Sequence, residues 1–355
     1  MSVHAESSST KRRVSVLLPG VDNIPVKGGG FFNTLRFVDL LSRHRETELV
    51  TYRHREPGTP FLEDIVDVME AERRIAVLVW GPDIEELLGR YHGRFPMVYY
   101  QRSNDWGIRL PADVPVLCIS KYTMATAQQY WPGNPQFYLP PALRPECRSD
   151  GRERDIDVLV VERKQPRYVV DDLVRRLESH CRVHVQRDFV SQDELIDLYR
   201  RSKVYLYSFA AMRTDHHHSG WRMMEGISNQ TLEAIACGCT VFSDLRGGQL
   251  DFVQPGQRGY KLQTHSPEWD VEQIRRAVAE YPQAGHDDHL AFVEQEYSEA
   301  AFHDRAPRLL SFLDGFFDFA AEHRPRVEAF DFPNPITTQQ RVREHLYRWK
   351  RRLLG

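Results

Sequence analysis

The chain has 355 residues, of which 41% are hydrophobic and 27% are charged, and its formal net charge is −3. Single hydrophobic cores usually stop growing at roughly 250–300 residues, so this length predicts two domains. The near-neutral charge provides no overall basic field for nucleic acid, and no apolar run reaches the roughly 18–20 residues that span a bilayer. Residues 1–13 are polar and lack the apolar core of a signal peptide, so we expect a disordered tail and a cytoplasmic protein.

Five cysteines are scattered along the chain, and their number is odd. This usage favours reduced thiols in a cytoplasmic protein over a disulfide framework. Cys237 and Cys239 are too close in sequence for the usual zinc pairing, and we interpret both as small core residues.

The first half of the chain alternates short apolar runs with helical patterns. Strands are expected at residues 14–18, 48–52, 75–80, 96–100 and 114–119. Helices are expected after the glycines at 28–30, at 64–71 and at 120–131. Strands and helices that alternate at these lengths predict a parallel, doubly wound sheet, which we assign to a domain of residues 14–142.

Three glycines, Gly28, Gly29 and Gly30, separate the first expected strand from the first expected helix. In this arrangement the backbone N–H groups at a helix start can approach phosphate closely. The spacing differs from the GxGxxG pattern, so a flexible connector is an equal alternative.

The composition changes at Pro140-Pro141 and at the charged run SDGRERD, and we interpret residues 143–155 as a linker. The α/β pattern then restarts. Strands are expected at 157–161, 183–186, 204–207 and 240–243, with helices at 169–179 and 192–202. The sequence therefore predicts two Rossmann-like domains that face each other across a cleft, the second at residues 156–305, followed by a helical segment at 306–355.

Two glutamates, Glu225 and Glu233, stand eight residues apart. A helix is expected to start near Asn229, with Ser228 or Asn229 as its cap and Gly238 at its end. Glu225 then lies in the loop before the helix, and Glu233 lies inside it. A helix N-terminus favours an anion and carboxylates accept hydrogen bonds from hydroxyls, so this stretch suits a ligand with phosphate and sugar hydroxyls. The competing interpretation is a solvated helix on which the two glutamates have no function.

The phrase EGISNQTLEAIACG, from Glu225 to Gly238, resembles the Glu-x7-Glu motif of the retaining, nucleotide-sugar-dependent glycosyltransferases of group 1. Gly247-Gly248 with Asp251 is similar to the family's GG-x-x-E/D segment, and DFVSQDELIDLYRRSKVYLYS resembles the strand, helix and strand that precede the motif. The N-terminal glycines match in position as well. The resemblance covers most of the chain and implies the GT-B architecture, with two Rossmann-like domains and a helical C-terminal segment.

The resemblance also implies roles for individual residues. Glu225 would hydrogen-bond hydroxyls of the donor sugar, and Glu233 would bind the ribose of the nucleotide. Backbone amides around Ser228, Asn229 and Gln230 would meet the diphosphate or the sugar. The glycines Gly28, Gly29 and Gly30 would let the N-terminal domain close on the phosphate and the acceptor.

In the same family, an Arg and a Lys after the first strand of the second domain neutralise the departing diphosphate. Here that expected strand is followed by ERKQPR, in which Arg163 matches the Arg. The second charge is either Lys164 or Arg167, although the usual spacing is not kept. Fixed cations suit this place because negative charge develops on the leaving group, and the resemblance implies neither a metal nor another cofactor. The alternative is that these are solvated loop charges.

Asn104 and Asp105 follow the expected strand at 96–100 and therefore fall at the carboxyl end that faces the cleft. The family often has a sugar-contacting His near this place, and one of these two residues is the expected substitute. Ser120 and Thr123 resemble a further family pattern, S-x-x-T, or else they form a helix cap.

The segment Asp215-His216-His217-His218 precedes the motif. A substrate-contacting loop and a polar surface loop are equal interpretations of it. A metal site is the less favoured alternative, because adjacent histidines cannot all face one ion.

Near the C-terminus, Val342, Leu346, Trp349 and Leu353 fall on one helical stripe flanked by arginine and lysine. A basic amphipathic helix of this kind favours peripheral membrane binding at the inner face of the membrane, which would suit a lipid-linked acceptor. The alternative is that the helix packs back on the first domain.

With the site residues, the resemblance implies a glycosyltransferase that moves a sugar from a nucleotide-diphosphate donor to a hydroxyl of a glycan or a lipid-linked acceptor, as in polysaccharide biosynthesis. That the enzyme retains the anomeric configuration is implied by the resemblance alone. Two alternatives stay open: a sugar-nucleotide epimerase or isomerase on the same architecture, and a non-catalytic sugar-nucleotide-binding subunit. No residue pair supplies the acid and base that an epimerase needs. A non-catalytic subunit would not need both glutamates and a cationic loop.

Overall fold

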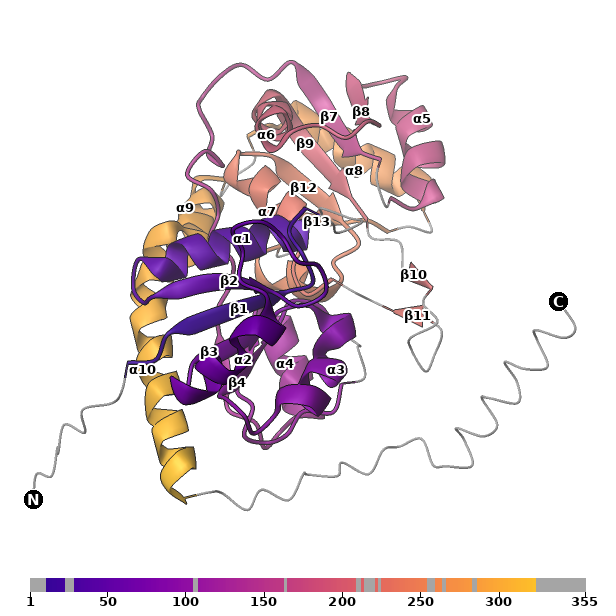
Figure 1. Cartoon of the computed structure of the whole chain (residues 1–355). Helices are drawn as coiled ribbons and strands as arrows, with labels where there is room; N and C mark the ends of the chain where they lie inside the picture. Colours follow the sequence, from indigo (N-terminus) through magenta and orange to yellow (C-terminus); the bar gives the residue numbers. More distant parts are fainter. Residues whose placement is uncertain are drawn as a thin grey trace, which may run out of the picture.

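The computed structural model describes residues 11–22, 29–104, 108–162, 165–208, 212–213, 221–222, 225–253, 259–263, 266–282 and 286–323. The described chain forms two α/β lobes, one above the other in Figure 1, and each is built on a parallel sheet. The doubly wound architecture that the alternation of strands and helices predicts is therefore confirmed.

The first sheet has six parallel strands in the order β2-β1-β3-β4-β5-β6. They are β1 (Val14–Leu18), β2 (Thr47–Thr51), β3 (Ile75–Leu78), β4 (Met97–Gln101), β5 (Val116–Cys118) and β6 (Gln136–Tyr138). Every residue of β1, β3, β4 and β5 is buried, because helices cover both faces of the sheet. The sequence pattern does not predict β6, since its three half-buried residues form no apolar run.

The helices of the first lobe lie between these strands. They are α1 (Gly29–Ser42), α2 (Leu62–Ala71), η1 (Gly81–Asp83), α3 (Ile84–Tyr91) and α4 (Lys121–Tyr130). Before α4, the Ser120 side chain accepts from the N–H of Thr123, and the Thr123 hydroxyl accepts from the N–H of Ser120. This reciprocal pair is a capping box, so the helix-cap interpretation of the two residues is confirmed.

The second sheet has five parallel strands in the order β13-β12-β9-β7-β8. They are β7 (Ile156–Val161), β8 (Val183–Gln186), β9 (Ser202–Tyr207), β12 (Thr240–Ser243) and β13 (Tyr260–Lys261). The surrounding helices are η2 (Tyr168–Leu173), α5 (Val174–Leu177), α6 (Gln192–Arg201), α7 (Asn229–Ala236), η3 (Gly247–Asp251), α8 (Pro267–Ala279) and α9 (His286–Tyr297). A separate two-stranded antiparallel sheet pairs β10 (Met212–Arg213) with β11 (Trp221–Arg222).

The last described helix, α10 (Glu299–His323), runs back along the first lobe (Figure 1). The ring centre of Phe302 on α10 lies 6.2 Å from that of Phe37 on α1, and the ring centre of Phe312 lies 6.3 Å from that of Phe137 on β6. Helices α1 and α10 pack on one face of the first sheet, whereas α2, α3 and α4 pack on the other.

Arg12 is buried against α10, although the sequence analysis assigns residues 1–13 to a disordered tail. Its backbone N–H donates to the carboxylate of Asp314, and its guanidinium pairs with Asp314 and Asp318. Arg45 completes the arrangement by donating to Asp314 over 2.9 Å. The tail prediction is wrong at Arg12 because local polarity carries no information about a partner 302 residues later in the chain.

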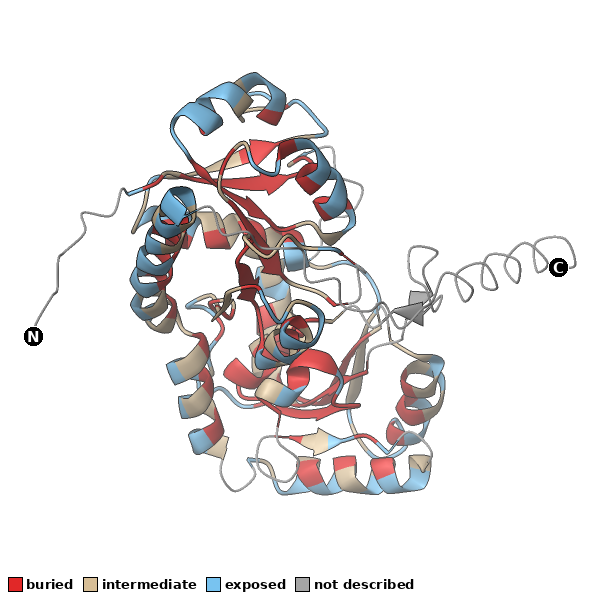
Figure 2. Cartoon of the chain, turned by 90° about the horizontal axis from the view of Figure 1, so that it is seen from below, coloured by how far each residue is buried: buried red, intermediate tan, exposed pale blue. Residues whose placement is uncertain are grey.

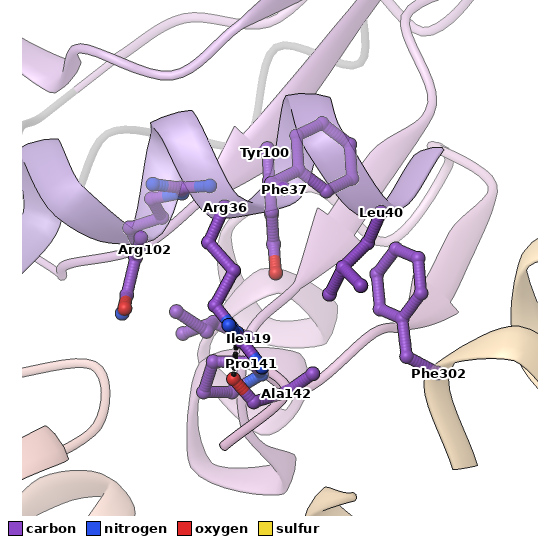
Figure 3. A pocket seen from close by; sticks show the side chains of 10 residues that line it. Arg36, Phe37, Leu40, Tyr100, Arg102, Ile119, Pro141, Ala142 and Phe302 are labelled. Carbon is purple, nitrogen blue, oxygen red and sulfur yellow. Dashed lines mark hydrogen bonds between the residues drawn. The ribbon is translucent and has the colours of Figure 1, made fainter. Parts of the chain in front are cut away.

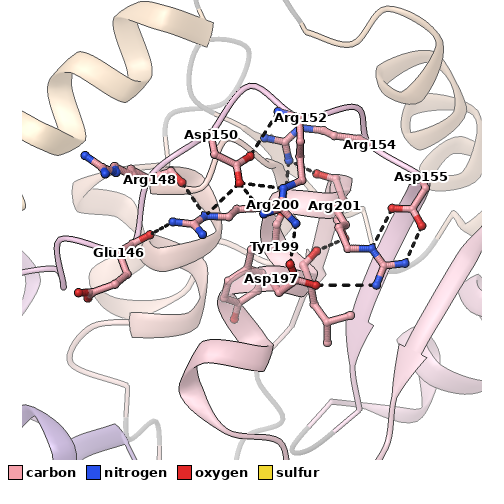
Figure 4. A network of polar contacts seen from close by, with 12 residues as sticks. Glu146, Arg148, Asp150, Arg152, Arg154, Asp155, Asp197, Tyr199, Arg200 and Arg201 are labelled. Carbon is pink, nitrogen blue, oxygen red and sulfur yellow. Dashed lines mark hydrogen bonds and ion pairs between the residues drawn. The ribbon is translucent and has the colours of Figure 1, made fainter.

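The residues between β6 and β7 are tied to the second lobe by a polar network (Figure 4). Arg154 is buried and donates to the carbonyls of Tyr199, Ser202 and Cys237, and its guanidinium lies 5.1 Å from the ring centre of Tyr281. One side chain thus satisfies backbone acceptors at the ends of both α6 and α7. Exposed ion pairs join Arg152 to Asp150 and Asp197, and Arg201 to Asp155.

Buried residues follow both sheets and the helices between them (Figure 2). The largest apolar cluster contains side chains from both lobes, including Phe37, Leu139, Leu232 and Tyr297. Cys237 and Cys239 are buried free thiols, as predicted. Within the described ranges, no helix is long and apolar enough to cross a membrane.

Candidate active site

Helix α7 begins and ends where the sequence predicts. Ser228 is its N-cap residue, and Gly238 follows its last turn with a φ of 93°, a conformation that favours glycine. The Ser228 hydroxyl lies 2.8 Å from the Thr231 hydroxyl and makes no cap bond to the backbone. The first N–H groups of α7, including those of Asn229 and Gln230, have no partner within the helix.

Glu225 lies just before α7 and is held by two donors. The hydroxyl of Tyr207, at the end of β9, donates to Oε1 of Glu225 over 2.5 Å. Nε2 of Gln249, on η3, donates to Oε2 over 3.3 Å. Burial and the neighbouring carboxylate raise the pKa of Tyr207 well above its ordinary value, so its hydroxyl keeps its proton and acts as a donor.

Glu233 lies inside α7 and is partly buried. Desolvation raises the pKa of its carboxyl from 4.5 to about 7, and the positive charges of Arg144 and Arg36 limit this rise. No hydrogen bond from the described part of the chain compensates the carboxylate for its lost hydration. The arrangement leaves Glu233 able to accept hydrogen bonds from a ligand.

The N-terminus of α1 meets the N-terminus of α7 across the two lobes. A Cβ atom on Gly29 would lie 3.3 Å from Nδ2 of Asn229. Both helices direct the positive end of their dipoles toward this place, which favours an anion. Beside it, Arg102 follows β4 and donates to the carbonyl of Gly30 over 2.9 Å and to the hydroxyl of Thr34 over 2.6 Å.

Close backbone contacts surround Glu225, one between the lobes and two within the second lobe. An added Cβ on Gly226 would come within 2.2 Å of the carbonyl oxygen of Arg102. Added Cβ atoms on Gly247, whose φ is 60°, and on Gly248 would come within 2.3 and 2.0 Å of the carbonyl oxygens of Glu225 and Gly226. These positions require glycine, because no side chain fits between the backbones.

A narrow pocket opens beside α1, at the junction of the lobes (Figure 3). Its lining includes two arginines, Arg36 and Arg102, and the rings of Tyr100 and Phe302. Arg36 donates to two backbone carbonyls of the connection between the lobes, and the Arg102 guanidinium lies 4.5 Å from the ring centre of Tyr100. Arg36 also pairs with Glu299 over 2.8 Å, and its charge acts on Glu233 of α7.

Comparison with known proteins identifies similar folds and one family model. Residues 163–304 match the family model described as glycosyl transferase-like, whereas a search of curated protein sequences finds no match. Among solved structures, Anabaena Alr3699/HepE in complex with UDP superposes with a TM-score of 0.59 and 12% identity, over 84% of this chain and 100% of that one. The sucrose-phosphate synthase of Thermosynechococcus elongatus gives a TM-score of 0.60 and 11% identity, over 86% and 99% of the two chains. A glycosyltransferase of Rickettsia africae gives 0.59 and 10%, over 85% and 98%.

The fold is GT-B. The family model covers the second GT-B lobe from the loop after β7 into α10, and this part carries Glu225, α7 and Glu233. The predicted fold class is therefore confirmed.

The remaining predicted site residues are divided between the two lobes. Gly29 and Gly30 begin α1, and Arg167 is exposed at the start of η2. Asn104 is buried, and its Oδ1 accepts a hydrogen bond from Nε2 of Gln101 over 3.1 Å. Among the described residues, no group of three His, Cys, Asp or Glu side chains could hold a metal ion. Outside the described residues lie Gly28, Asp105, Arg163, Lys164, Asp215, His216, His217, His218 and residues 324–355.

The sequence motifs do not identify three residues of the site, namely Tyr207, Gln249 and Arg102. Tyr207 ends a strand and Arg102 follows one, so a survey of every strand's carboxyl end would identify both. Gln249 gives no such signal, because it lies on a short 3-10 helix that produces no periodic pattern.

Proposed function

We propose that this GT-B chain is a retaining glycosyltransferase, which moves a sugar from a nucleoside diphosphate donor to a hydroxyl of a glycan or a lipid-linked acceptor. One observation carries the proposal: the N-termini of α1 and α7 meet at Gly29 and Asn229, with the carboxylates of Glu225 and Glu233 before and within α7. Two positive helix ends suit a diphosphate, and carboxylates suit the hydroxyls on either side of it. The likeness in fold to the Anabaena protein, whose structure contains UDP, is consistent with such a donor.

Each end of the donor has a partner in this scheme. Glu233 accepts hydrogen bonds from the ribose, and Glu225 accepts them from the sugar that is transferred. The backbone N–H groups at the start of α7, from Ser228 to Gln230, bind the diphosphate. The cationic loop after β7, with Arg163 and either Lys164 or Arg167, offsets the charge of the departing nucleotide.

Retention follows from displacement on one face of the sugar. The bond from the anomeric carbon to the diphosphate breaks, the acceptor oxygen bonds to the same face, and an oxygen of the departing diphosphate takes the acceptor's proton. No side chain is assigned as general base. The helix ends and the cationic loop stabilise the negative charge on the leaving group, so the scheme uses neither a metal ion nor a cofactor.

A panel of nucleotide sugars tests the proposal. The unaltered chain is expected to release a nucleoside diphosphate from at least one donor and to form a glycoside with the donor's anomeric configuration, which NMR of the product reports. Glu225→Gln is expected to lower kcat by roughly 100-fold. An inverted product contradicts retention, and conversion of the sugar without loss of the nucleotide favours an epimerase. No binding of any nucleotide sugar overturns the proposal.

Peripheral membrane contact through the C-terminal segment is a separate proposal. It rests only on the apolar stripe of residues 342–353 and the arginines and lysines that flank it. Truncation before Gln340 is expected to abolish co-sedimentation with anionic liposomes. Unchanged co-sedimentation of the truncated chain overturns this proposal.

A further inference from the structure

Tyr207 fixes one oxygen of Glu225 from the core of the second lobe. The tyrosine is 6% exposed and ends β9, and its ring centre lies 6.1 Å from that of Tyr205 on the same strand. Its hydroxyl reaches Oε1 of Glu225 over 2.5 Å, the length of a strong bond between a hydroxyl and a carboxylate. The position of this oxygen is therefore set by a buried strand.

Gln249 fixes the other oxygen, and its amide has only one possible orientation. Gln249 is fully buried, and its Oε1 accepts a hydrogen bond from the hydroxyl of Ser243. Oγ of Ser243 in turn accepts from the N–H of Leu245 over 3.2 Å. Because an ionised carboxylate only accepts hydrogen bonds, the amide must present its N–H group to Oε2 of Glu225, and its oxygen then faces the Ser243 hydroxyl. A chain of donors thus runs from the backbone after β12 to the carboxylate.

The same strand ends reach the loop after β7. Ser208, next to Tyr207, donates its N–H to Oε1 of Gln165 over 2.8 Å and its hydroxyl to Asp244 over 3.1 Å. Gln165 directly follows the cationic segment assigned above to the leaving group. Tyr207 therefore lies where the sugar-binding carboxylate and the loop after β7 are joined.

We propose that Tyr207 and Gln249 are positioning residues, which hold the carboxylate of Glu225 in the single orientation that receives the donor sugar. This inference rests on the proposed function and deepens it: recognition of the sugar, as distinct from the nucleotide, depends on two residues that act through Glu225. Two donors also favour the ionised form of a carboxylate, which is the better acceptor for sugar hydroxyls.

The test compares the affinity for the nucleotide sugar with the affinity for the nucleoside diphosphate alone. Tyr207→Phe removes the donor and keeps the ring. The matched control is Tyr168→Phe, which removes a hydroxyl that donates to Asp270 over 2.6 Å between η2 and α8. Calorimetry is performed with UDP and UDP-glucose, and with GDP and GDP-mannose if the uridine pair does not bind. Tyr207→Phe is expected to bind the nucleoside diphosphate as the unaltered chain does and to bind the nucleotide sugar at least tenfold more weakly.

The pH profile of kcat/KM distinguishes a positioning role from a purely structural one, because a purely structural change would not shift it. A hydrogen-bond donor favours the ionised form of the carboxylate that it contacts, so the acid limb of kcat/KM is expected at higher pH in Tyr207→Phe and unchanged in the control. Gln249→Met, which keeps the side-chain volume and removes the other donor, is expected to give the same change. It replaces Tyr207→Phe in the test if that variant does not fold. Unchanged sugar affinity and an unchanged acid limb in these variants overturn this inference alone. If neither ligand pair binds, the calorimetry uses the donor that the panel of nucleotide sugars identifies. No binding of any nucleotide sugar to the unaltered chain overturns the proposed function, and this inference with it.

Discussion

Asp251 of the second lobe caps a helix of the first: its Oδ2 accepts a hydrogen bond of 2.5 Å from the N–H of Lys121, the first residue of α4. Burial raises the pKa of Asp251, and the backbone N–H groups of Lys121 and Tyr122 limit the rise. Because η3 carries both Asp251 and Gln249, the same short helix joins the lobes and contacts Glu225.

Removal of this cap is expected to weaken the contact between the two lobes. Asp251→Ala leaves the start of α4 without its partner from the second lobe, and we expect a loss of about 1–2 kcal/mol in the free energy of unfolding. The radius of gyration from small-angle scattering and the KM for the nucleotide sugar should both rise. Ser120→Ala, which removes the cap of α4 from within the first lobe, should cost similar stability without changing the radius. Equal radii for the two variants would contradict this role of Asp251.

The pKa of Glu233 predicts a pH-dependent stability. Since its pKa is about 7 in the folded chain and 4.5 ordinarily, the folded chain binds more protons than the unfolded chain between these values. The contribution of Glu233 to the free energy of unfolding is greatest below pH 4.5, and it falls by roughly 2–3 kcal/mol as the pH rises to about 7. Glu233→Gln should therefore unfold at a higher urea concentration than the unaltered chain at pH 8 and at a similar one near pH 5. The same variant should bind UDP more weakly, and equal pH slopes for the two proteins would refute the assignment.

Gly226→Ala tests the closeness of the lobes. Its Cβ would meet the backbone oxygen of Arg102 at 2.2 Å, and a backbone atom at the end of a buried strand cannot turn aside. We expect a lower Tm and at least a tenfold loss of turnover. Gly315→Ala is the control, because no atom lies within 4 Å of an added Cβ there, and alanine should stabilise α10 by roughly 0.5–1 kcal/mol. Normal turnover in Gly226→Ala would show that the contact is not needed.

Arg154→Met is expected to destabilise the second lobe by roughly 3 kcal/mol, because it leaves buried carbonyls of Tyr199, Ser202 and Cys237 without their donor. The exposed Arg152→Met should cost less than about 1 kcal/mol, since its partners Asp150 and Asp197 remain hydrated. Urea denaturation of both variants measures the difference. Equal losses would contradict the role given to Arg154.

The features that could be predicted from the sequence are those that a short stretch of residues determines. The buried run of β1 and the box of Ser120 with Thr123 are encoded within a few residues, and so are the start and end of α7. Short elements such as β6 and η3 escape prediction because three to five residues carry too little pattern.

The contacts that complete the site join residues from distant stretches. Tyr207 and Glu225 are 18 residues apart, and Lys121 and Asp251 are 130 apart. Neither pair produces a local signal, because each depends on which strand ends and which lobes come together. The motif identifies Glu225 and Glu233 as candidates, whereas only the fold reveals which groups hold one carboxylate and leave the other without a donor from the described chain.

The return of α10 to the first lobe has a consequence for the order in which the protein forms during synthesis. The strands of the first sheet end at Tyr138, but the helix that covers part of one face begins at Glu299. At about 5–20 residues per second, a ribosome needs roughly 10–30 s to make the chain between them. During that interval the apolar surface that later meets Phe302, Leu309 and Leu313 has no partner helix. The first lobe is thus the first to be translated and the last to be completed, and the nascent chain exposes this surface to chaperones until α10 emerges.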